Sequence, residues 1–270
     1  MTYKTIVYEA RGRVARVMLN RPRYRNAQSR LLLEEMDAAF AAAVADDEIR
    51  VVVLGGVGEH FSAGHDLGTP DELEDAARRP YPKGIRGQYQ RSWDVNVENS
   101  LLWRELSKPT IAMVQGYCIF GGWLIASTMD LIIAADDAKY LPSFVQYFSV
   151  PWDLGPRKTK EILFQNRFVG AQEACDLGFV NQVVPRADLE SRAMELAESI
   201  AENDRFILRM IKFAVNNAQD AMGFRSAVRA AHSSYFLIET GGRLRTGAGD
   251  EPPAMRKMDL VRKAVDKIRK

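Results

Sequence analysis

Two loops of the 270-residue chain have a composition suited to polarising a carbonyl group. The first, HFSAGHDLG (His60–Gly68), follows an apolar run, and its small residues would let backbone N–H groups approach a ligand closely. The second, CIFGGWLIA (Cys118–Ala126), places Gly121 and Gly122 at the start of a helical pattern, where the partial positive charge favours a developing negative one. Two amides from separate loops can stabilise an oxyanion in acyl chemistry. Each loop taken alone is also compatible with a tight turn.

Strand and helix signals alternate around these loops. Two short strands at 5–10 and 14–20 precede a predicted helix from about Ser29, its N-cap, to Asp46. Continuous apolar runs predict strands that are buried on both faces at Arg50–Gly56, Thr110–Gly116 and Asp130–Asp136. Strands separated by helices predict an α/β fold with a largely parallel sheet covered by helices.

Two parts of the chain depart from this alternation. Residues 68–93 include Pro70, Pro80 and Pro82, and we expect an irregular, mobile flap there. The pattern then becomes nearly all helical, which predicts an α/β core over 1–185 and a helical C-terminal region over 186–270. The final basic helix either meets phosphates or presents a solvated face.

Composition limits the class of protein. Apolar residues make up 47% of the chain without a tract of about 18, so a globular protein with no membrane partner is expected. The 37 basic and 35 acidic residues nearly cancel, so nucleic acid is not an expected partner. Cys118 and Cys175 are too few for a disulfide framework or a metal cluster. The first residues lack the apolar core of a signal peptide, which favours a cytoplasmic location.

Four segments of the chain resemble the successive signatures of the enoyl-CoA hydratase/isomerase family, the crotonases. They are LNRPRYRNA, FSAGHDL, KPTIAMVQGYCIFGGWLIASTMDLIIAADDAKY and AQEACDLGFVNQVVP, in that order, and the resemblance runs from about Val7 to Asn216. It implies a crotonase-like spiral of short ββα units, with a helical C-terminal region used to form trimers or dimers of trimers. It also implies acyl-CoA thioester substrates, with coenzyme A as part of the substrate and no tightly bound cofactor or metal.

The resemblance assigns roles to individual positions. The two oxyanion-hole amides fall on His65 and Gly121, through their backbone N–H groups. The His65 imidazole stands where a small residue is more usual, and it either acts on the substrate or points aside. Guanidinium groups pair well with phosphate oxygens, so arginines are candidates for phosphate contacts unless they are simply solvated. The positions implied for contacts with the CoA ester are Arg23, Arg25, Ala63, Asp66 and Leu67.

The resemblance also identifies two absent groups. In hydratases of the family, glutamates at the positions of Leu124 and Phe144 position and activate the water that adds across the double bond. Water addition needs a group that can take and return a proton, and these two side chains cannot do so. Hydration by the usual pair is therefore not expected, although the thioester site is retained. Leu124 and Phe144 are expected to line the acyl site instead.

Replacement chemistry is expected in residues 140–160. Some relatives use an aspartate eight residues after the second glutamate position, which ungapped counting places at Trp152, one residue before Asp153. Apolar neighbours would raise the pKa of Asp153 toward a useful range. Alternatively, Asp153 caps the following helix. Trp152 is expected beside the substrate, and weaker polar candidates are Tyr89, Asp94, Glu98, Ser143, Gln146 and Tyr147.

These residues together predict an acyl-CoA-processing enzyme. The expected activity is that of a hydratase/isomerase-type lyase or isomerase with Asp153 as the acid/base residue. A non-catalytic acyl-CoA binding protein is an alternative that the apolar Leu124 and Phe144 favour. A crotonase-type hydrolase is another, in which the same oxyanion hole is used and water is activated elsewhere.

Overall fold

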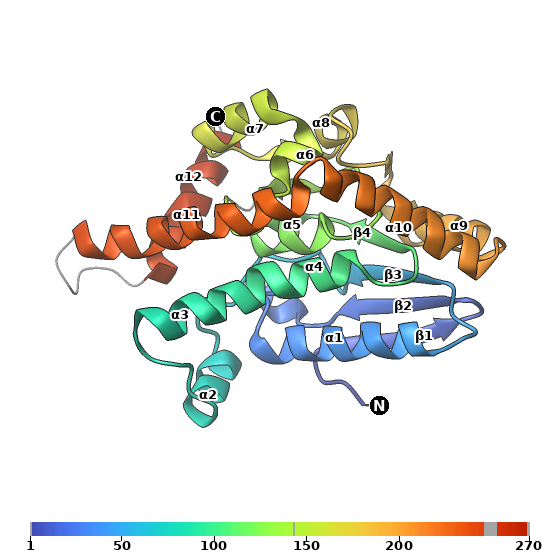
Figure 1. Ribbon diagram of the computed structural model, residues 1–270, viewed down its shortest axis with the longest axis horizontal. Helices are drawn as coiled ribbons and strands as arrows, with labels where there is room; N and C mark the ends of the chain where they lie inside the picture. The colour runs from blue at the N-terminus through green and yellow to red at the C-terminus, as the bar shows by residue number, and fades with distance from the viewer. Residues whose placement is uncertain (1, 143, 246–252, 269–270) are drawn as a thin grey trace.

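The structure, a computed structural model, describes residues 2–142, 144–245 and 253–268 and contains two sheets (Figure 1). The larger sheet has the strand order β1-β2-β3-β4-β6-β9, and the smaller has the order β5-β7-β8. The first two strands pair antiparallel, and the other pairs of the larger sheet are parallel. The strands are β1 (Ile6–Arg11), β2 (Val14–Leu19), β3 (Val51–Gly56), β4 (Thr110–Val114), β5 (Tyr117–Ile119), β6 (Leu131–Ala135), β7 (Lys139–Leu141), β8 (Val169–Gly170) and β9 (Gln182–Val184).

Helices cover both faces of the larger sheet. Val52 and Leu54 of β3 pack in one core with α1 (Arg30–Ala45), whereas Val51 and Val53 pack in a second core with α9 (Leu189–Ala201). Successive strand residues point to opposite faces, so a strand covered on both sides is apolar throughout. The α/β fold, the two N-terminal strands and the strands expected from the three apolar runs are therefore confirmed. The short strands β5, β7, β8 and β9 were not predicted.

The first helix begins and ends as the sequence predicts. Ser29 is its N-cap, and the Ser29 Oγ accepts a hydrogen bond from the Leu32 amide at 3.2 Å. Its buried side chains recur at helical spacing, which matches the predicted apolar face. The helix thus fixes the chain immediately after the LNRPRYRNA segment.

The expectation of an irregular flap at 68–93 is wrong. The segment forms α2 (Pro70–Arg78) and α3 (Gly84–Trp93), which continues through a π-helical turn (η2, Asp94–Glu98) into α4 (Asn99–Arg104). Pro70 stands at the start of α2, where its missing N–H costs nothing, and the other two prolines lie between the helices. Tyr81 stabilises this connection, because its ring lies between two guanidinium groups. The Cζ atoms of Arg30 and Arg91 lie 3.7 Å and 3.1 Å from the centroid of the ring.

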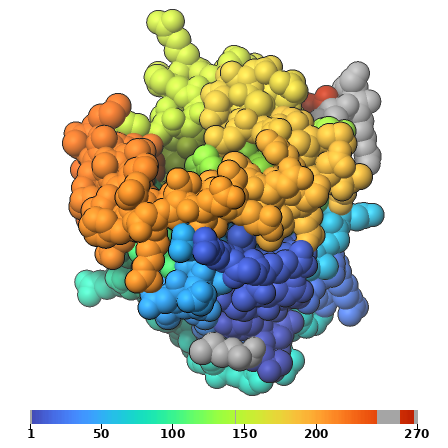
Figure 2. All heavy atoms as spheres, turned by 90° about the vertical axis from the view of Figure 1, so that its right-hand side faces the viewer, coloured from blue at the N-terminus to red at the C-terminus, as the bar shows by residue number. Residues whose placement is uncertain are grey.

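Most of the residues that the structure describes from Arg186 onward are helical, as predicted. Helix α10 (Arg205–Ala221) lies on the surface near α9, as Figure 2 shows, and α11 (Phe224–Arg245) runs across the molecule toward α12 (Pro253–Ile268). Helix α12 packs Ala264 into a cluster with Phe120, Leu141 and Phe168. The remaining helices are η1 (Pro22–Tyr24), α5 (Gly121–Ala126), α6 (Val150–Leu154), α7 (Pro156–Gln165), α8 (Ala171–Asp176) and η3 (Arg186–Asp188).

Within the described residues, no helix is both long enough and apolar enough to span a membrane. In the same part of the chain, no three His, Cys, Asp or Glu side chains gather as a metal ion would need.

Candidate functional site

The two glycine-containing loops lie side by side. Ser62 and Cys118 form a parallel bridge, in which the Ser62 amide donates to the Tyr117 carbonyl at 3.0 Å and the Ile119 amide donates to the Ser62 carbonyl at 3.0 Å. One loop follows β3 and the other links β5 to α5. Main-chain hydrogen bonds, which do not depend on side-chain conformation, therefore set the distance between the loops.

This close approach of the two loops requires glycine at Gly64 and Gly122. A Cβ atom at Gly64 would lie 2.6 Å from the Ile119 carbonyl oxygen, and one at Gly122 would lie 2.6 Å from the Ser62 carbonyl oxygen. A Cβ atom at Gly121 would lie 2.3 Å from the Gln28 Oε1. Gly64 also has a φ of +90°, which L side chains rarely adopt.

The backbone geometry directs the His65 amide away from Gln28. The Gln28 amide donates to the Gly64 carbonyl at 2.8 Å, and the Asp66 amide donates to the Gln28 carbonyl at 3.1 Å. In an extended strand, successive residues present their backbone groups to opposite sides. The N–H of His65 therefore points to the side of the strand opposite Gln28. The His65 imidazole lies next to Gly121, because its Cε1 would be 3.1 Å from a Cβ built on that glycine.

Gly121 follows a strained residue. Phe120 has φ 46° and ψ −100°, a conformation that is unfavourable for a residue with a Cβ. The Phe120 amide donates to the Leu141 carbonyl at 2.8 Å, which holds the turn in place. Gly121 begins α5, so its N–H points out of the first helical turn and has no acceptor within the helix.

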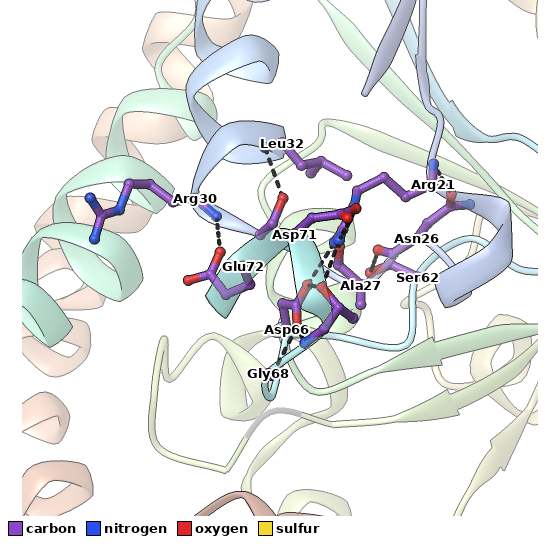
Figure 3. A network of polar contacts seen from close by, with 12 residues as sticks. Arg21, Asn26, Ala27, Arg30, Leu32, Ser62, Asp66, Gly68, Asp71 and Glu72 are labelled. Atoms are coloured by element: carbon purple, nitrogen blue, oxygen red, sulfur yellow. Dashed lines mark hydrogen bonds and ion pairs between the residues drawn. The ribbon is translucent and has the colours of Figure 1, made fainter. Parts of the chain in front are cut away.

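A buried polar network supports the first loop, His60–Gly68 (Figure 3). The Asp66 side chain is 0% exposed and accepts hydrogen bonds from Arg21 Nη1 (2.7 Å), the Thr69 hydroxyl (2.6 Å), the Thr69 amide (2.8 Å) and the Gly68 amide (3.0 Å). Burial acts to raise the pKa of Asp66, but these hydrogen bonds outweigh it, and the pKa lies below its ordinary value. The carboxylate is thus held as an anion facing Arg21.

The segment before α1 completes this support. Asn26 accepts from the Arg21 amide at 2.8 Å and donates to the His60 carbonyl at 2.8 Å, while the Ser62 hydroxyl donates to the Asn26 carbonyl at 2.8 Å. Arg21 and Asn26 were not among the predicted site residues. In the sequence they are the first and last residues of RPRYRN, within the first of the family-like segments, and both are buried in the fold.

A cavity of about 890 Å³ opens beside the two loops. Its rim carries exposed residues, including Arg25, Leu67 and Arg262, and its deeper part carries the buried Gln146 and Tyr235. Helices α11 and α12 form one side of it. The wall is mostly apolar, as binding sites for small molecules usually are.

The predicted site residues divide into two groups. Those on the cavity wall are Arg25, Ala63, His65, Asp66, Leu67 and Phe144, and the carboxylate of Asp66 is turned to Arg21. Gly121 lies directly behind the wall, against His65. The wall formed by the described residues does not include Arg23, Leu124, Trp152 or Asp153. Leu124 is 1% exposed and belongs to the core, and Arg23 is exposed beside the Tyr24 ring.

Asp153 does not cap the following helix, so that alternative is wrong. Helix α7 begins after Gly155, whereas Asp153 lies within α6, where its carboxylate accepts a hydrogen bond from the Ser149 hydroxyl at 2.7 Å. Burial raises the pKa of Asp153 to about 6, against the opposing effects of hydrogen bonds from Ser149 and Trp123. Trp152 packs on the Phe224 ring, with centroids 5.7 Å apart.

The other polar candidates lie in different places. Gln146 is on the cavity wall and donates to the Tyr235 hydroxyl at 2.9 Å, a partner 89 residues away that no sequence pattern indicated. Tyr147 is buried in the core, and burial raises its pKa above the ordinary value. The cavity wall, as far as the structure describes it, does not include Tyr89, Asp94 or Glu98. Ser143 lies outside the described residues.

Comparisons with known proteins agree with this architecture. A sequence model of the family described as Enoyl-CoA hydratase/isomerase matches residues 9–236. A Mycobacterium tuberculosis protein named as enoyl-CoA hydratase EchA13 is 38% identical over 261 residues, which cover 87% of this chain and 82% of that protein. The hydroxycinnamoyl-CoA hydratase-lyase of Pseudomonas fluorescens is 32% identical over 228 residues, which cover 81% of this chain and 80% of that protein. A Mycobacterium smegmatis crystal structure described as an enoyl-CoA hydratase has a TM-score of 0.83 at 38% identity, covering 92% of this chain and 99% of that one.

The glycine requirement predicts the effect of a single methyl group. Gly122→Ala would press its Cβ against the Ser62 backbone, and we expect a loss of about 1–3 kcal/mol in the free energy of unfolding. Gly170→Ala is the matched control, because no atom lies within 4 Å of its Cβ position. Urea denaturation of both variants checks this, and equal stabilities would contradict it.

The buried pair predicts a pH-dependent loss of stability. Asp66→Asn leaves the Arg21 guanidinium, 4% exposed, without its anion and should cost about 3 kcal/mol at pH 7. Because the pKa of Asp66 lies below its ordinary value of about 4, its contribution is present above that pH and is lost as the pH falls through the folded-state pKa. The difference between wild type and variant should therefore shrink in acid.

Asp71→Asn is the control for this pair. It removes a carboxylate that is 64% exposed and 3.3 Å from the same guanidinium, so it should change stability by less than about 1 kcal/mol. Urea unfolding at pH 7 and at about pH 3 measures both differences. If the free energies of unfolding of wild type and Asp66→Asn differed by the same amount at both pH values, the ion pair would not be the cause of the lost stability.

Proposed function

The chain belongs to the enoyl-CoA hydratase/isomerase family and has its crotonase fold, and from this premise we propose that it acts on an acyl-CoA thioester. The backbone N–H groups of His65 and Gly121 would bind the thioester oxygen. The observation that supports this most is the pairing of the two loops at 3.0 Å, with the His65 N–H directed away from Gln28. Losing one such donor typically costs about 3 kcal/mol of transition-state stabilisation.

Coenzyme A would enter from the rim of the cavity. The exposed Arg25 stands there, and its guanidinium suits a phosphate. Arg23 lies nearby on the surface and would meet the same end of the ligand. Ala63 and Leu67 would contact the pantetheine arm through their small or apolar side chains. In this proposal coenzyme A is part of the substrate, and no tightly bound cofactor is required.

The chemistry would be a proton transfer next to the thioester. A group that removes a proton from the α carbon generates an enolate, which the two amides stabilise. Returning the proton at the γ carbon completes an isomerase reaction, whereas collapse of the enolate with loss of a group from the β carbon, which leaves with its bonding pair, completes a lyase reaction. Leu124 and Phe144 cannot exchange protons. We propose Asp153 for this step because its pKa of about 6 lets it change protonation state near neutrality. Asp153 does not line the cavity formed by the described residues, so this role requires the segment that it shares with Phe144 and Gln146 to move when a substrate binds.

A protein that binds acyl-CoA without converting it is the alternative function. Phe144 contributes an aromatic ring to the cavity wall and stacks on Phe120, with centroids 5.6 Å apart. These side chains would favour binding of an apolar acyl group but could not activate water. Binding without turnover would support this alternative.

The acid/base assignment predicts a loss of turnover without a loss of binding. Asp153→Asn should reduce kcat at least 100-fold for crotonyl-CoA and longer enoyl-CoA esters while leaving Kd nearly unchanged. In the wild type, kcat should rise with pH through about 6 if the carboxylate acts as the base. Asp176→Asn, on the surface of α8, is the control. Normal turnover by Asp153→Asn would exclude Asp153 as the acid/base residue.

We also propose assembly into a homotrimer or a dimer of trimers through α10. One side of this helix exposes large apolar residues at helical spacing, namely Phe206, Ile207, Met210, Ile211 and Val215. An exposed apolar stripe of this size on a surface helix commonly marks a protein interface. Figure 2 shows α10, in orange, on the surface of the molecule.

The assembly prediction concerns the solution mass. The double variant Ile207→Asp/Ile211→Asp should be a monomer, because two charges cannot be desolvated at an apolar interface. Phe164→Asp places one charge on an exposed apolar position of α7 and should leave the assembly unchanged. Light scattering after gel filtration measures both, and a trimeric double variant would exclude this face.

A further inference from the structure

The imidazole of His65 lies beside the proposed thioester site. His65 is half-buried on the cavity wall, and its ring packs against Gly121, since the Cε1 would be 3.1 Å from a Cβ built on that glycine. Gly121 is itself buried behind the wall that the described residues form. A thioester oxygen that reaches the Gly121 amide must therefore approach along the imidazole, which would touch the substrate next to its carbonyl group.

The neighbours of His65 determine where this ring lies. The residues before and after it form main-chain hydrogen bonds with Gln28, at 2.8 Å and 3.1 Å. Gln28 is buried, its Nε2 donates to the Ser62 hydroxyl at 3.3 Å, and its Oε1 would be 2.3 Å from a Cβ on Gly121. The carboxamide and the imidazole therefore flank the same point of the Gly121 backbone. Buried, hydrogen-bonded neighbours thus keep the ring beside the proposed oxyanion hole.

His65 is the residue best suited to exchange a proton near neutral pH among those that the structure describes on the wall. Asp66 is held as an anion by Arg21 and by three further hydrogen bonds, and Asp266 is exposed on α12. The other ionisable residues of this wall are arginines, which stay charged, and tyrosines, which ordinarily keep their proton to about pH 10. Histidine, by contrast, gains and loses a proton near neutrality and commonly serves as an acid or a base.

We propose, on the basis of the acyl-CoA function proposed above, that the His65 imidazole is a catalytic residue that delivers the second proton of the reaction. Asp153 takes the proton from the α carbon, and the electron pair of that C–H bond forms the enolate. The N–H bond of the imidazolium then breaks, and its electron pair stays on the ring. In an isomerisation the proton bonds to the γ carbon, and in an elimination it bonds to the group that leaves the β carbon with its own electron pair. Transfer of the proton from Asp153 to His65 through solvent restores both groups.

Turnover of two esters tests this role. But-3-enoyl-CoA reports isomerisation and 3-hydroxybutyryl-CoA reports elimination, and both yield crotonyl-CoA, which chromatography quantifies. His65→Ala should lower kcat about 100-fold or more for each ester that the wild type converts, as loss of a general acid does. Its Kd for butyryl-CoA, which cannot react in either way, should stay within about 3-fold of wild type, because the backbone N–H of residue 65 remains.

Proton exchange separates delivery of the second proton from removal of the first. In D2O, His65→Ala should still exchange the α protons of butyryl-CoA at a rate within about 3-fold of wild type, because Asp153 performs that step. Asp153→Asn should lose the exchange. Mass spectrometry of the recovered ester measures the deuterium that it has gained.

Two further variants serve as controls. His65→Gln keeps a polar side chain but cannot act as an acid near neutral pH, so it should be as slow as His65→Ala. Asp176→Asn, on the surface of α8, should keep the wild-type kcat.

The remaining outcomes distinguish this proposal from the function on which it rests. Wild-type turnover by His65→Ala or by His65→Gln overturns the role of the imidazole and leaves the acyl-CoA function intact. Loss of α-proton exchange in His65→Ala also overturns it, because the ring would then be needed before the second proton transfer. If the wild type binds butyryl-CoA but converts neither ester, the proposed catalysis fails as well, and if it binds no ester, the acyl-CoA function itself fails.

Discussion

The structure around the cavity depends on one backbone contact, the approach of the loop after β3 to the loop before α5. Reciprocal main-chain hydrogen bonds join Ser62 to residues 117 and 119, and neither Gly64 nor Gly122 leaves room for a Cβ against the facing backbone. Backbone groups held in this way cannot relax toward solvent, so they keep their direction when a ligand enters. The strained φ of Phe120 is part of the same constraint, because the turn that it makes brings the chain from β5 into α5 with Gly121 beside His65.

A buried ion pair and its hydrogen bonds stabilise the first of these two loops. Arg21 and Asp66 are almost fully buried, which is costly for isolated ions, yet four hydrogen bonds to the Asp66 carboxylate compensate for its desolvation. Asn26 links this pair to the backbone of the first loop. A network of this kind confers rigidity only when every member is satisfied, which explains why the polar residues cluster at the base of the loop.

The cavity combines a family scaffold with an individual lining. The loops that would hold a thioester come from the α/β part of the chain, whereas Tyr235 and Arg262 come from the C-terminal helices. In the proposed function, binding of the coenzyme A portion and recognition of the acyl group would thus involve different elements. Residues in the lining can change without disturbing the main-chain contact, and the side chain at position 144 illustrates such a change.

The sequence by itself determined the elements that depend on local patterns. Apolar runs identified β3, β4 and β6, a capping serine and helical spacing identified α1, and ordered motifs identified the family. It misjudged residues 68–93, because the interaction of Tyr81 with Arg30 and Arg91 that orders the connection joins side chains that are distant along the chain. Only the tertiary structure placed Asp153 within α6 and Tyr235 against Gln146. Propensity and periodicity act between near neighbours, whereas these contacts arise from packing over many residues, which no short pattern encodes.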